Sequence, residues 1–365
     1  MNRLLPLIAA MLLCARVASS QATPWQWINP LPQGNLLNGV WIVNAETTLA
    51  VGDLGTILRT TNGGSTWDVQ FNAAGIEEQL FALQFISGSV GWAVGETGTI
   101  LKSTDGGRSW NIQNTPLPYD LYAINFVSPT TGWVCGFQGT ILKTTDGGAS
   151  WAVENSTTGS TLYSLYFSTA TTGWAAGVNG TIVKTTNGGA SWSTQSIATG
   201  QPLFSIAFTS SLVGYCVGAF GLLYKTVNGG ITWSPQVSGT DLSLFSVQFT
   251  SSLVGFATGE YGAIIKTTNS GTSWVPQSSQ TYNDLFATRF SSSTNGWVVG
   301  DLGTMLKTTD GGTTWLPKSS GIKNALNSIS FPGITTGFAA GDLGTVASTT
   351  EIGRASCRER VYVLV

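Results

Sequence analysis

The side chains that could carry out chemistry are few in this chain. Histidine, the commonest general base and a common metal ligand, does not occur among its 365 residues. Hydrolysis by a carboxylate pair needs two acids within about 5–10 Å, and spacing along the chain does not exclude such a pair. Glu260 beside Tyr261 is the most suggestive pair, but both residues lie in a Gly-x-x-Gly turn that recurs along the chain. We therefore expect no catalytic site, no metal and no cofactor.

Composition and charge exclude further classes of function. The formal net charge is −2, so a nucleic-acid partner has no electrostatic support, because such binding needs clustered Lys and Arg. Arg3, the apolar run 4–15 and the small residues Ala18 and Ser20 form the pattern of a cleaved signal peptide. The apolar run is too short to span a bilayer. Residues 1–20 thus predict a secreted or periplasmic protein that does not span the membrane.

A short motif ending in tryptophan recurs along the chain and indicates its architecture. Its copies are 41 residues apart, except for a first step of 43, and end at Trp67, Trp110, Trp151, Trp192, Trp233, Trp274 and Trp315. Each copy contains four short apolar runs, in the second copy 80–86, 91–95, 98–104 and 109–113. These runs are rich in aromatic and β-branched residues and are separated by glycine turns, as in a strand meander. Four strands per repeat predict an all-β propeller with four-stranded blades.

The two ends of the repeat array predict how the ring closes. The segment from Pro24 resembles the fourth strand that starts at Ser109, and residues 326–350 supply only three strands of a further unit. We expect eight blades, the last completed by an N-terminal strand headed by Trp25; seven blades with one unit left over are the alternative. The propeller then spans residues 21–350. Residues 351–365 are interpreted as a truncated tail or as foreign, since 352–361 resembles a translated sequencing adapter.

The repeated motif, S/T-x-D/N-x-G-x-S/T-W, belongs at the hairpin between the third and fourth strands. Its acid or amide can accept bonds from N–H groups of the turn, its glycines permit positive φ, and its tryptophan can wedge between sheets. Asparagine replaces aspartate at Asn62, Asn187, Asn228 and Asn269. An acid–base or metal role would not tolerate that exchange, so we expect a structural role. The structural residues so assigned include Asp105, Trp110, Asp146, Trp151, Asp310 and Trp315.

The motif and its surroundings resemble two known groups of proteins. The motif itself is the Asp box, or BNR repeat, which sialidases and related glycosidases also carry. The longer runs 91–110 and 296–315 more closely resemble the repeat of the photosystem II stability and assembly factor family, over nearly all of residues 24–350. That resemblance implies a non-catalytic propeller that binds protein partners during assembly of a membrane complex. A sialidase needs three converging arginines, whereas Arg59, Arg108 and Arg289 occupy three different positions of the repeat and cannot converge on one centre. A sialidase-like glycoside hydrolase is therefore the less favoured alternative.

The turn between the second and third strands is the candidate binding region. It should lie with the blade-to-blade links on the rim opposite the Asp boxes, where propellers of this kind bind ligands. Its first variable residue is acidic in blades 6, 7, 8, 1 and 2 and apolar in blades 3 to 5, where it is Phe137, Val178 or Ala219. An insertion after Trp67 adds two acids. The candidate binding residues are Asp53, Glu77, Glu78, Glu96, Phe137, Glu260, Asp301 and Asp342.

We interpret this pattern as a polarised rim that binds a basic or amphipathic protein segment. The alternative is that aspartate simply suits turns and glutamate is solvated. A glycan-binding, adhesin-like propeller is a second alternative, for which Phe137, Phe220 and Tyr261 would supply aromatic platforms. We expect a monomer.

Two other sets of residues have structural interpretations. A basic residue recurs on the Asp-box rim as Arg59, Lys102, Lys143, Lys184, Lys225, Lys266 and Lys307. Recurrence in nearly every blade indicates an architectural role, with the stem packed beside the tryptophan, rather than a site for an acidic polymer. Cys135 and Cys216 are one place out of register, so alternation directs them to opposite sheet faces. We expect two buried thiols and no disulfide between them.

Overall fold

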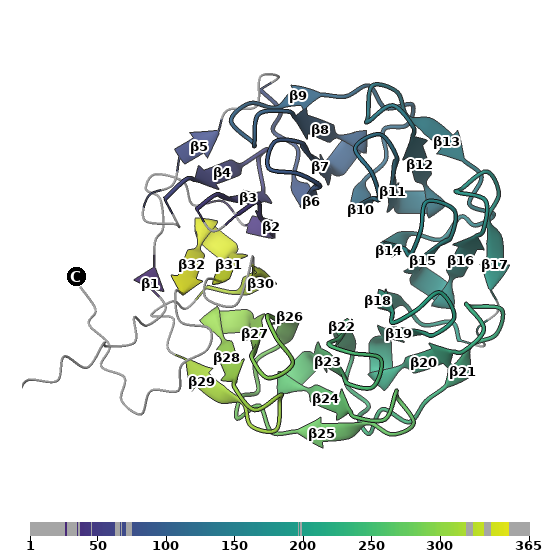
Figure 1. Ribbon diagram of the computed structural model, residues 1–365, viewed down its shortest axis with the longest axis vertical. Helices are drawn as coiled ribbons and strands as arrows, with labels where there is room; N and C mark the ends of the chain where they lie inside the picture. The colour runs from purple at the N-terminus through teal and green to yellow at the C-terminus, as the bar shows by residue number, and fades with distance from the viewer. Residues whose placement is uncertain are drawn as a thin grey trace, which may run out of the picture.

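The structure is a computed structural model that describes residues 26–27, 35, 37–44, 46–62, 66, 68–70, 75–195, 197, 199–318, 324–331 and 337–349. These residues form eight four-stranded sheets that are arranged as the blades of a ring (Figure 1). The predicted all-β propeller with eight blades is confirmed, and the seven-bladed alternative is wrong.

The blades follow one another in chain order, and each sheet is an antiparallel meander. Blade 1 contains β2 (Leu37–Ile42), β3 (Thr48–Gly52), β4 (Ile57–Thr60) and β5 (Asp68–Gln70), and blade 2 contains β6 (Leu80–Phe85), β7 (Gly91–Gly95), β8 (Ile100–Ser103) and β9 (Asn111–Ile112). Blade 3 contains β10 (Leu121–Phe126), β11 (Gly132–Gly136), β12 (Ile141–Thr144) and β13 (Ala152–Glu154), and blade 4 contains β14 (Leu162–Phe167), β15 (Gly173–Gly177), β16 (Ile182–Thr185) and β17 (Ser193–Gln195).

The second half of the ring repeats this pattern. Blade 5 contains β18 (Leu203–Phe208), β19 (Gly214–Gly218), β20 (Leu223–Thr226) and β21 (Ser234–Pro235), and blade 6 contains β22 (Leu244–Phe249), β23 (Gly255–Gly259), β24 (Ile264–Thr267) and β25 (Val275–Gln277). Blade 7 contains β26 (Leu285–Phe290), β27 (Gly296–Gly300), β28 (Met305–Thr308) and β29 (Leu316–Lys318), and blade 8 contains β30 (Leu326–Ser330), β31 (Gly337–Gly341), β32 (Val346–Thr349) and β1 (Gln26–Trp27).

The ring closes by pairing the two ends of the propeller. Strand β1 runs antiparallel to β32, with Gln26 opposite Ser348 and Trp27 opposite Ala347. The N-terminal strand thereby completes blade 8, as the sequence predicts, and it covers an edge of β32 that would otherwise remain unpaired. Trp25 and residues 351–365 lie outside the described residues.

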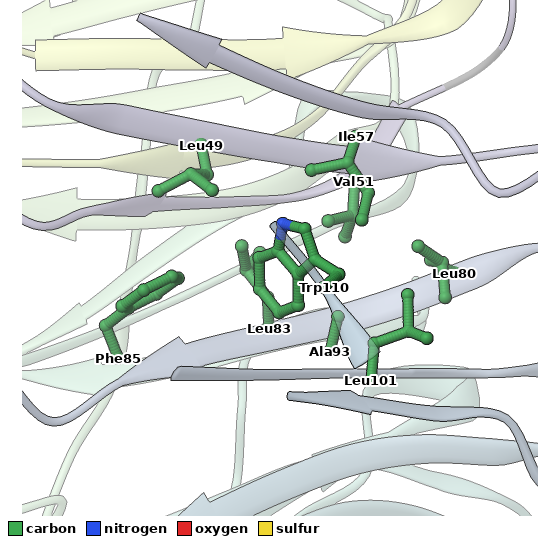
Figure 2. Close-up of a cluster of buried hydrophobic side chains, with 9 residues drawn as sticks. All are labelled: Leu49, Val51, Ile57, Leu80, Leu83, Phe85, Ala93, Leu101 and Trp110. Atoms are coloured by element: carbon green, nitrogen blue, oxygen red, sulfur yellow. The ribbon is translucent and has the colours of Figure 1, made fainter. Parts of the chain in front are cut away.

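The core consists of apolar layers between neighbouring sheets. The second strand of each blade is buried along its whole length, as in β7, because both of its faces pack against adjacent blades. Figure 2 shows one layer, in which Trp110 of blade 2 lies between Leu49 and Val51 of blade 1 and Leu83 of its own blade. The six described Asp-box tryptophans are all at most 7% exposed. Their predicted role as wedges between sheets is therefore confirmed for these six, while Trp67 lies outside the described residues.

The first strand of every blade contains a β-bulge at its second residue. In blade 2, Leu80 is opposite Gly95 and Ala82 is opposite Val94, so Phe81 is an additional residue without its own partner. The same shift occurs in the first strands of the other seven blades. A bulge of this kind redirects the side chain of the additional residue.

The two described cysteines behave as predicted. Cys135 and Cys216 are free and fully buried, and each packs against blade 4, one from blade 3 and the other from blade 5. Burial raises the pKa of both thiols. Among the described residues, no helix has the length and apolar character needed to cross a membrane.

Candidate functional site

The eight Gly-x-x-Gly turns sit on the blade-to-blade links. In blades 2 to 8 they are single 3-10 turns, namely η1 (Glu96–Gly98), η2 (Phe137–Gly139), η3 (Val178–Gly180), η4 (Ala219–Gly221), η5 (Glu260–Gly262), η6 (Asp301–Gly303) and η7 (Asp342–Gly344). In blade 1 the corresponding turn, 52–55, is closed by a hydrogen bond from Thr56 N to Asp53 O at 3.0 Å. In blade 2, Glu96 N donates to Gln79 O at 2.9 Å, and Thr115 Oγ1 donates to Gly98 O at 2.9 Å. Gln79 precedes the blade and Thr115 follows it, so turns and links share one rim. We call this the Gly-x-x-Gly rim.

The second variable residue of each of these turns has a left-handed backbone. Its φ lies between 48° and 57° at Leu54, Thr97, Gln138, Asn179, Phe220, Tyr261, Leu302 and Leu343. Residues other than glycine rarely adopt this conformation, and such strain is concentrated at functional sites. In blades 5, 6, 7, 8 and 1 the residue is also large and apolar or aromatic and 60–67% exposed. We call Phe220, Tyr261, Leu302, Leu343 and Leu54 the apolar crown.

Two residues of the apolar crown, Phe220 and Tyr261, were predicted as aromatic platforms, whereas Leu302, Leu343 and Leu54 were not predicted. The sequence does contain the signal of the whole crown, an apolar residue before the second glycine in five successive blades. In the apolar arc predicted for blades 3 to 5, Phe137 is 41% exposed, whereas Val178 is partly buried and Ala219 is only 7% exposed. The first position is held against the link, as when Ala219 N donates to Pro202 O at 3.0 Å.

Four of the predicted acids line one cavity of about 540 Å³ at the junction of blades 8, 1 and 2. They are Asp53, Glu77, Glu96 and Asp342. The remaining lining residues are Asn35, Leu54, Gln79 and Leu343. We call this the acidic cavity. The other predicted rim residues, Glu78, Phe137, Glu260 and Asp301, do not line it.

The acids of the rim also organise its backbone. Gln79 donates from Nε2 to Asp53 Oδ1 and from its backbone N to Glu96 Oε2, the latter at 3.2 Å. In blade 6, Ser243 N donates to Glu260 Oε2 at 2.9 Å. These bonds hold turn and link together, so part of the acidic pattern is structural. A carboxylate has about four lone-pair positions, so the bonds orient the acids without saturating them.

The described lining of the acidic cavity contains four carboxylates and no lysine or arginine. A cation entering it would therefore be attracted by several acids at once. Within the described part of the chain, no three His, Cys, Asp or Glu residues are grouped so that they could hold a metal ion.

The Asp boxes on the opposite rim are closed hydrogen-bond networks. In blade 3, Asp146 Oδ1 accepts from Thr144 Oγ1 at 2.8 Å and from Ser150 N at 2.9 Å, while Oδ2 accepts from Ser150 Oγ at 2.5 Å. Asn187 in blade 4 makes the corresponding bonds, except that its amide donates to Ser191 Oγ at 2.9 Å. The exchange of acid for amide therefore preserves the turn.

These networks make the stability of the propeller sensitive to acid. Hydrogen bonds from Ser150 lower the pKa of Asp146 to about 2. Burial raises the pKa of Asp105 and Asp310, but hydrogen bonds outweigh it and lower both values to about 2. A carboxyl with a lowered folded-state pKa contributes stability that is present above about pH 4 and is lost as the pH falls toward 2.

We therefore expect the Asp105→Asn/Asp146→Asn/Asp310→Asn variant to lose less of its Tm between pH 4 and pH 2 than the wild type. Thermal unfolding followed by circular dichroism across this range measures the difference. Asn187→Asp is the reverse control and should steepen the decline. Parallel pH profiles for all three proteins would contradict the assignment.

The Asp boxes of blades 2 to 6 each accept a hydrogen bond from the preceding blade, which we call the clamp. In blades 3 to 6 the donor is the aromatic residue of the preceding blade's second strand, as when Trp92 Nε1 donates to Gly147 O at 3.1 Å. The recurrent basic residue lies over the same aromatic ring, with Lys102 Nζ 5.7 Å from the Trp92 ring centroid. In blade 1, Arg59 Nε donates to Gly106 O at 2.7 Å.

These contacts confirm the architectural role predicted for the basic residues. The prediction named the wrong tryptophan, however, because the antiparallel register pairs Lys102 with Trp92 of the second strand. The sequence shows both residues but not the clamp, which joins positions 55 residues apart.

The geometry can be compared with known proteins. The sequence matches the protein family described as "Photosynthesis system II assembly factor YCF48" over residues 17–116, 108–194, 155–234, 192–281 and 274–361. A comparison with curated proteins gives no match.

Solved structures of similar fold include two YCF48 proteins. The one described as "YCF48 bound to D1 peptide" has 19% identity and a TM-score of 0.65, covering 90% of this chain and 97% of that chain. YCF48 from Cyanidioschyzon merolae has 18% identity and a TM-score of 0.66, covering 90% and 99%. The computationally designed Ika8 protein has 13% identity and a TM-score of 0.73, covering 88% and 98%. At these identities the likeness shows the fold alone.

Proposed function

The chain belongs to the photosynthesis system II assembly factor YCF48 family, and on that premise we propose that it is a non-catalytic, exported propeller that binds a protein segment. The binding surface is the Gly-x-x-Gly rim. The observation that carries the proposal is that this rim presents the acidic cavity and the apolar crown side by side, since Leu54 and Leu343 belong to both.

The chemistry of this surface suits a basic, amphipathic segment. The apolar crown offers large side chains that are 60–67% exposed on five successive blades, where a protein segment could bury them. The four carboxylates of the cavity complement Lys or Arg. Charge complementarity of this kind steers association and selects partners.

Two further observations support a role in assembly outside the cytoplasm. A YCF48 structure of the same fold is described as bound to a D1 peptide, so a propeller of this family can take a peptide ligand. Residues 1–20 have the charge and hydropathy pattern of an export signal. An envelope protein complex under assembly is therefore the class of partner that we propose.

Affinity capture tests the proposal. The full chain, purified after export, serves as bait for a cell-envelope extract of the source organism, and bound proteins are identified by mass spectrometry. The Asp53→Asn/Glu96→Gln/Asp342→Asn variant, called the amide variant below, is the matched bait, because amides retain hydrogen-bond acceptors and remove charge. We expect envelope proteins that the wild type retains and the amide variant does not. Equal recovery by both baits would contradict the proposal.

Glycan binding is the second candidate function. Phe220 and Tyr261, on neighbouring blades, are 67% and 64% exposed, and exposed aromatic faces can stack on sugars. Retention of the full chain on a polysaccharide column, together with no protein captured from the extract, would favour this function over protein binding.

A further inference from the structure

The bulge residues of the first strands form an unusual ring-wide set. They are Asn38, Phe81, Tyr122, Tyr163, Phe204, Phe245, Phe286 and Asn327. The first strands β2, β6, β10, β14, β18, β22, β26 and β30 are the innermost of their blades (Figure 1). In six consecutive blades, 2 to 7, the bulge residue is aromatic.

These six aromatic residues touch one another from blade to blade. The ring centroids of successive pairs, from Phe81–Tyr122 to Phe245–Phe286, are 5.1, 5.6, 6.2, 5.7 and 5.8 Å apart. Contacts between neighbours all along the innermost strands place the side chains on the inner side of the ring. Tyr163 is 37% exposed and the other five are partly buried, so solvent still reaches them. We call this set the aromatic belt.

The belt is interrupted at blades 8 and 1, two of the three blades that form the acidic cavity. In blades 1 and 8 the bulge residue is asparagine: Asn38 Nδ2 donates to Leu80 O at 2.9 Å, and Asn327 Nδ2 donates to Leu37 O at 3.2 Å. Asn327 Nδ2 also donates to Asp342 Oδ1, a cavity residue, at 3.1 Å. At the other end of the cavity, Gln79 stands two residues before Phe81. The belt and the cavity therefore adjoin on one rim.

The fold itself does not require aromatic residues at this position. Asn38 and Asn327 occupy it in the same bulge and bond to the backbone of the following blade. The six aromatic residues in blades 2 to 7 and the two asparagines beside the acidic cavity therefore reflect the residue type at this position and are not a consequence of the bulge. Inside the ring, blades 2 to 7 present aromatic residues and blades 8 and 1 present asparagine, and these two blades also contribute Asp342 and Asp53 to the acidic cavity.

We propose that the aromatic belt and the acidic cavity form one continuous binding site for a protein segment in which Lys or Arg stands next to aromatic or large aliphatic residues. The basic side chain enters the acidic cavity, and the apolar side chains lie against the belt. Aromatic faces also attract cations, so both halves of the site favour a basic segment. This inference rests on the proposed function and adds the chemistry of the ligand and its entry into the ring.

Peptide selection tests the inference without knowledge of the natural partner. A random 12-residue peptide library displayed on phage is selected against the full chain, and the affinity of the selected synthetic peptides is measured by fluorescence anisotropy. We expect a consensus that combines Lys or Arg with aromatic or large aliphatic residues. No consensus, or one without a basic residue, would overturn the inference.

Two variants locate the bound peptide. The belt variant Tyr163→Asn/Phe204→Asn/Phe245→Asn introduces the residue that blades 1 and 8 carry at this position, and Tyr163→Asn alone is the milder version should the triple change unfold the chain. We expect the Kd of selected peptides to rise at least tenfold in the belt variant and in the amide variant, and severalfold for Tyr163→Asn.

The outcomes separate this inference from the proposed function. If selected peptides bind the belt variant and Tyr163→Asn as tightly as the wild type but no longer bind the amide variant, the role of the belt is refuted and the proposed function stands. Unchanged binding to all variants would refute both. Binding of cellohexaose or chitohexaose that the belt variant loses, without peptide binding, would assign the belt to glycans and overturn the inference.

Discussion

Replacing Trp133 with alanine is expected to lower the free energy of unfolding by about 3–5 kcal/mol. Trp133 is fully buried, and its ring stacks on Phe167 with centroids 3.7 Å apart. Its Nε1 donates to Gly188 O at 3.2 Å in the next Asp box. The substitution leaves a cavity between two sheets and a buried carbonyl without its donor. Urea unfolding of the full chain, followed by circular dichroism, measures the loss.

The chain supplies its own controls for this position. Blade 5 has Tyr215, whose hydroxyl donates to Ser270 O at 2.6 Å, and blade 6 has Phe256, whose ring has no donor. Trp133→Tyr should therefore lower the free energy of unfolding by less than Trp133→Phe does, and both should lower it by less than Trp133→Ala does. A loss below about 1 kcal/mol for alanine, at the low end of core substitutions, would show that the clamp contributes little.

Neutralising the acidic cavity is expected to weaken the binding of a basic protein segment by about tenfold or more, since close charge pairs across interfaces have coupling energies of about 1.5 kcal/mol or more. The amide variant keeps the size and the hydrogen-bond acceptors of Asp53, Glu96 and Asp342 and removes three negative charges. The affinity of the captured partner, or of a selected peptide, is measured by fluorescence anisotropy at two salt concentrations. The difference in affinity between the amide variant and the wild type should become smaller at high salt, because salt screens exposed charges.

A second variant separates a local effect from that of net charge. Glu46→Gln/Asp68→Asn/Glu154→Gln also removes three negative charges, from a turn on the Asp-box rim and from two fourth strands. It should bind like the wild type. An equal loss of affinity in both variants would show that the partner responds to overall charge and not to the cavity.

The fold was predictable from the sequence because its signals are local and repeated. The 41-residue spacing of Trp110, Trp151 and their counterparts defines a unit that cannot bury both faces alone, so the units must stack. Three strands left over at one end and one at the other then predict the closure that β1 and β32 make. The Asp-box network spans seven residues, from Thr144 to Ser150, so its structural role is also contained in the sequence.

The candidate site was predictable only in part, because it depends on the direction of side chains. The sequence identified the acids of the rim. The alternation of side chains along a strand, however, does not predict the direction of the side chain of a turn residue with positive φ. The left-handed backbone at Leu54 and Tyr261 turns these side chains outward, while the link holds Ala219 inward. The bulge at Phe81 and Tyr122 likewise breaks the alternation that would have placed them.

By itself, the sequence determined the blade and the structural role of the Asp box, because each follows from contacts within one repeat or between successive repeats. It favoured eight blades over seven, and the pairing of β1 with β32 decided the number. Only the tertiary structure decided that Asp342 shares a cavity with Asp53 and Glu96. The sequence predicted that closure of the ring brings blade 8 beside blade 1, but not which side chains the turns and links direct into a shared cavity. The aromatic belt has the same origin, since its residues meet only when the first strands line the centre of a closed ring.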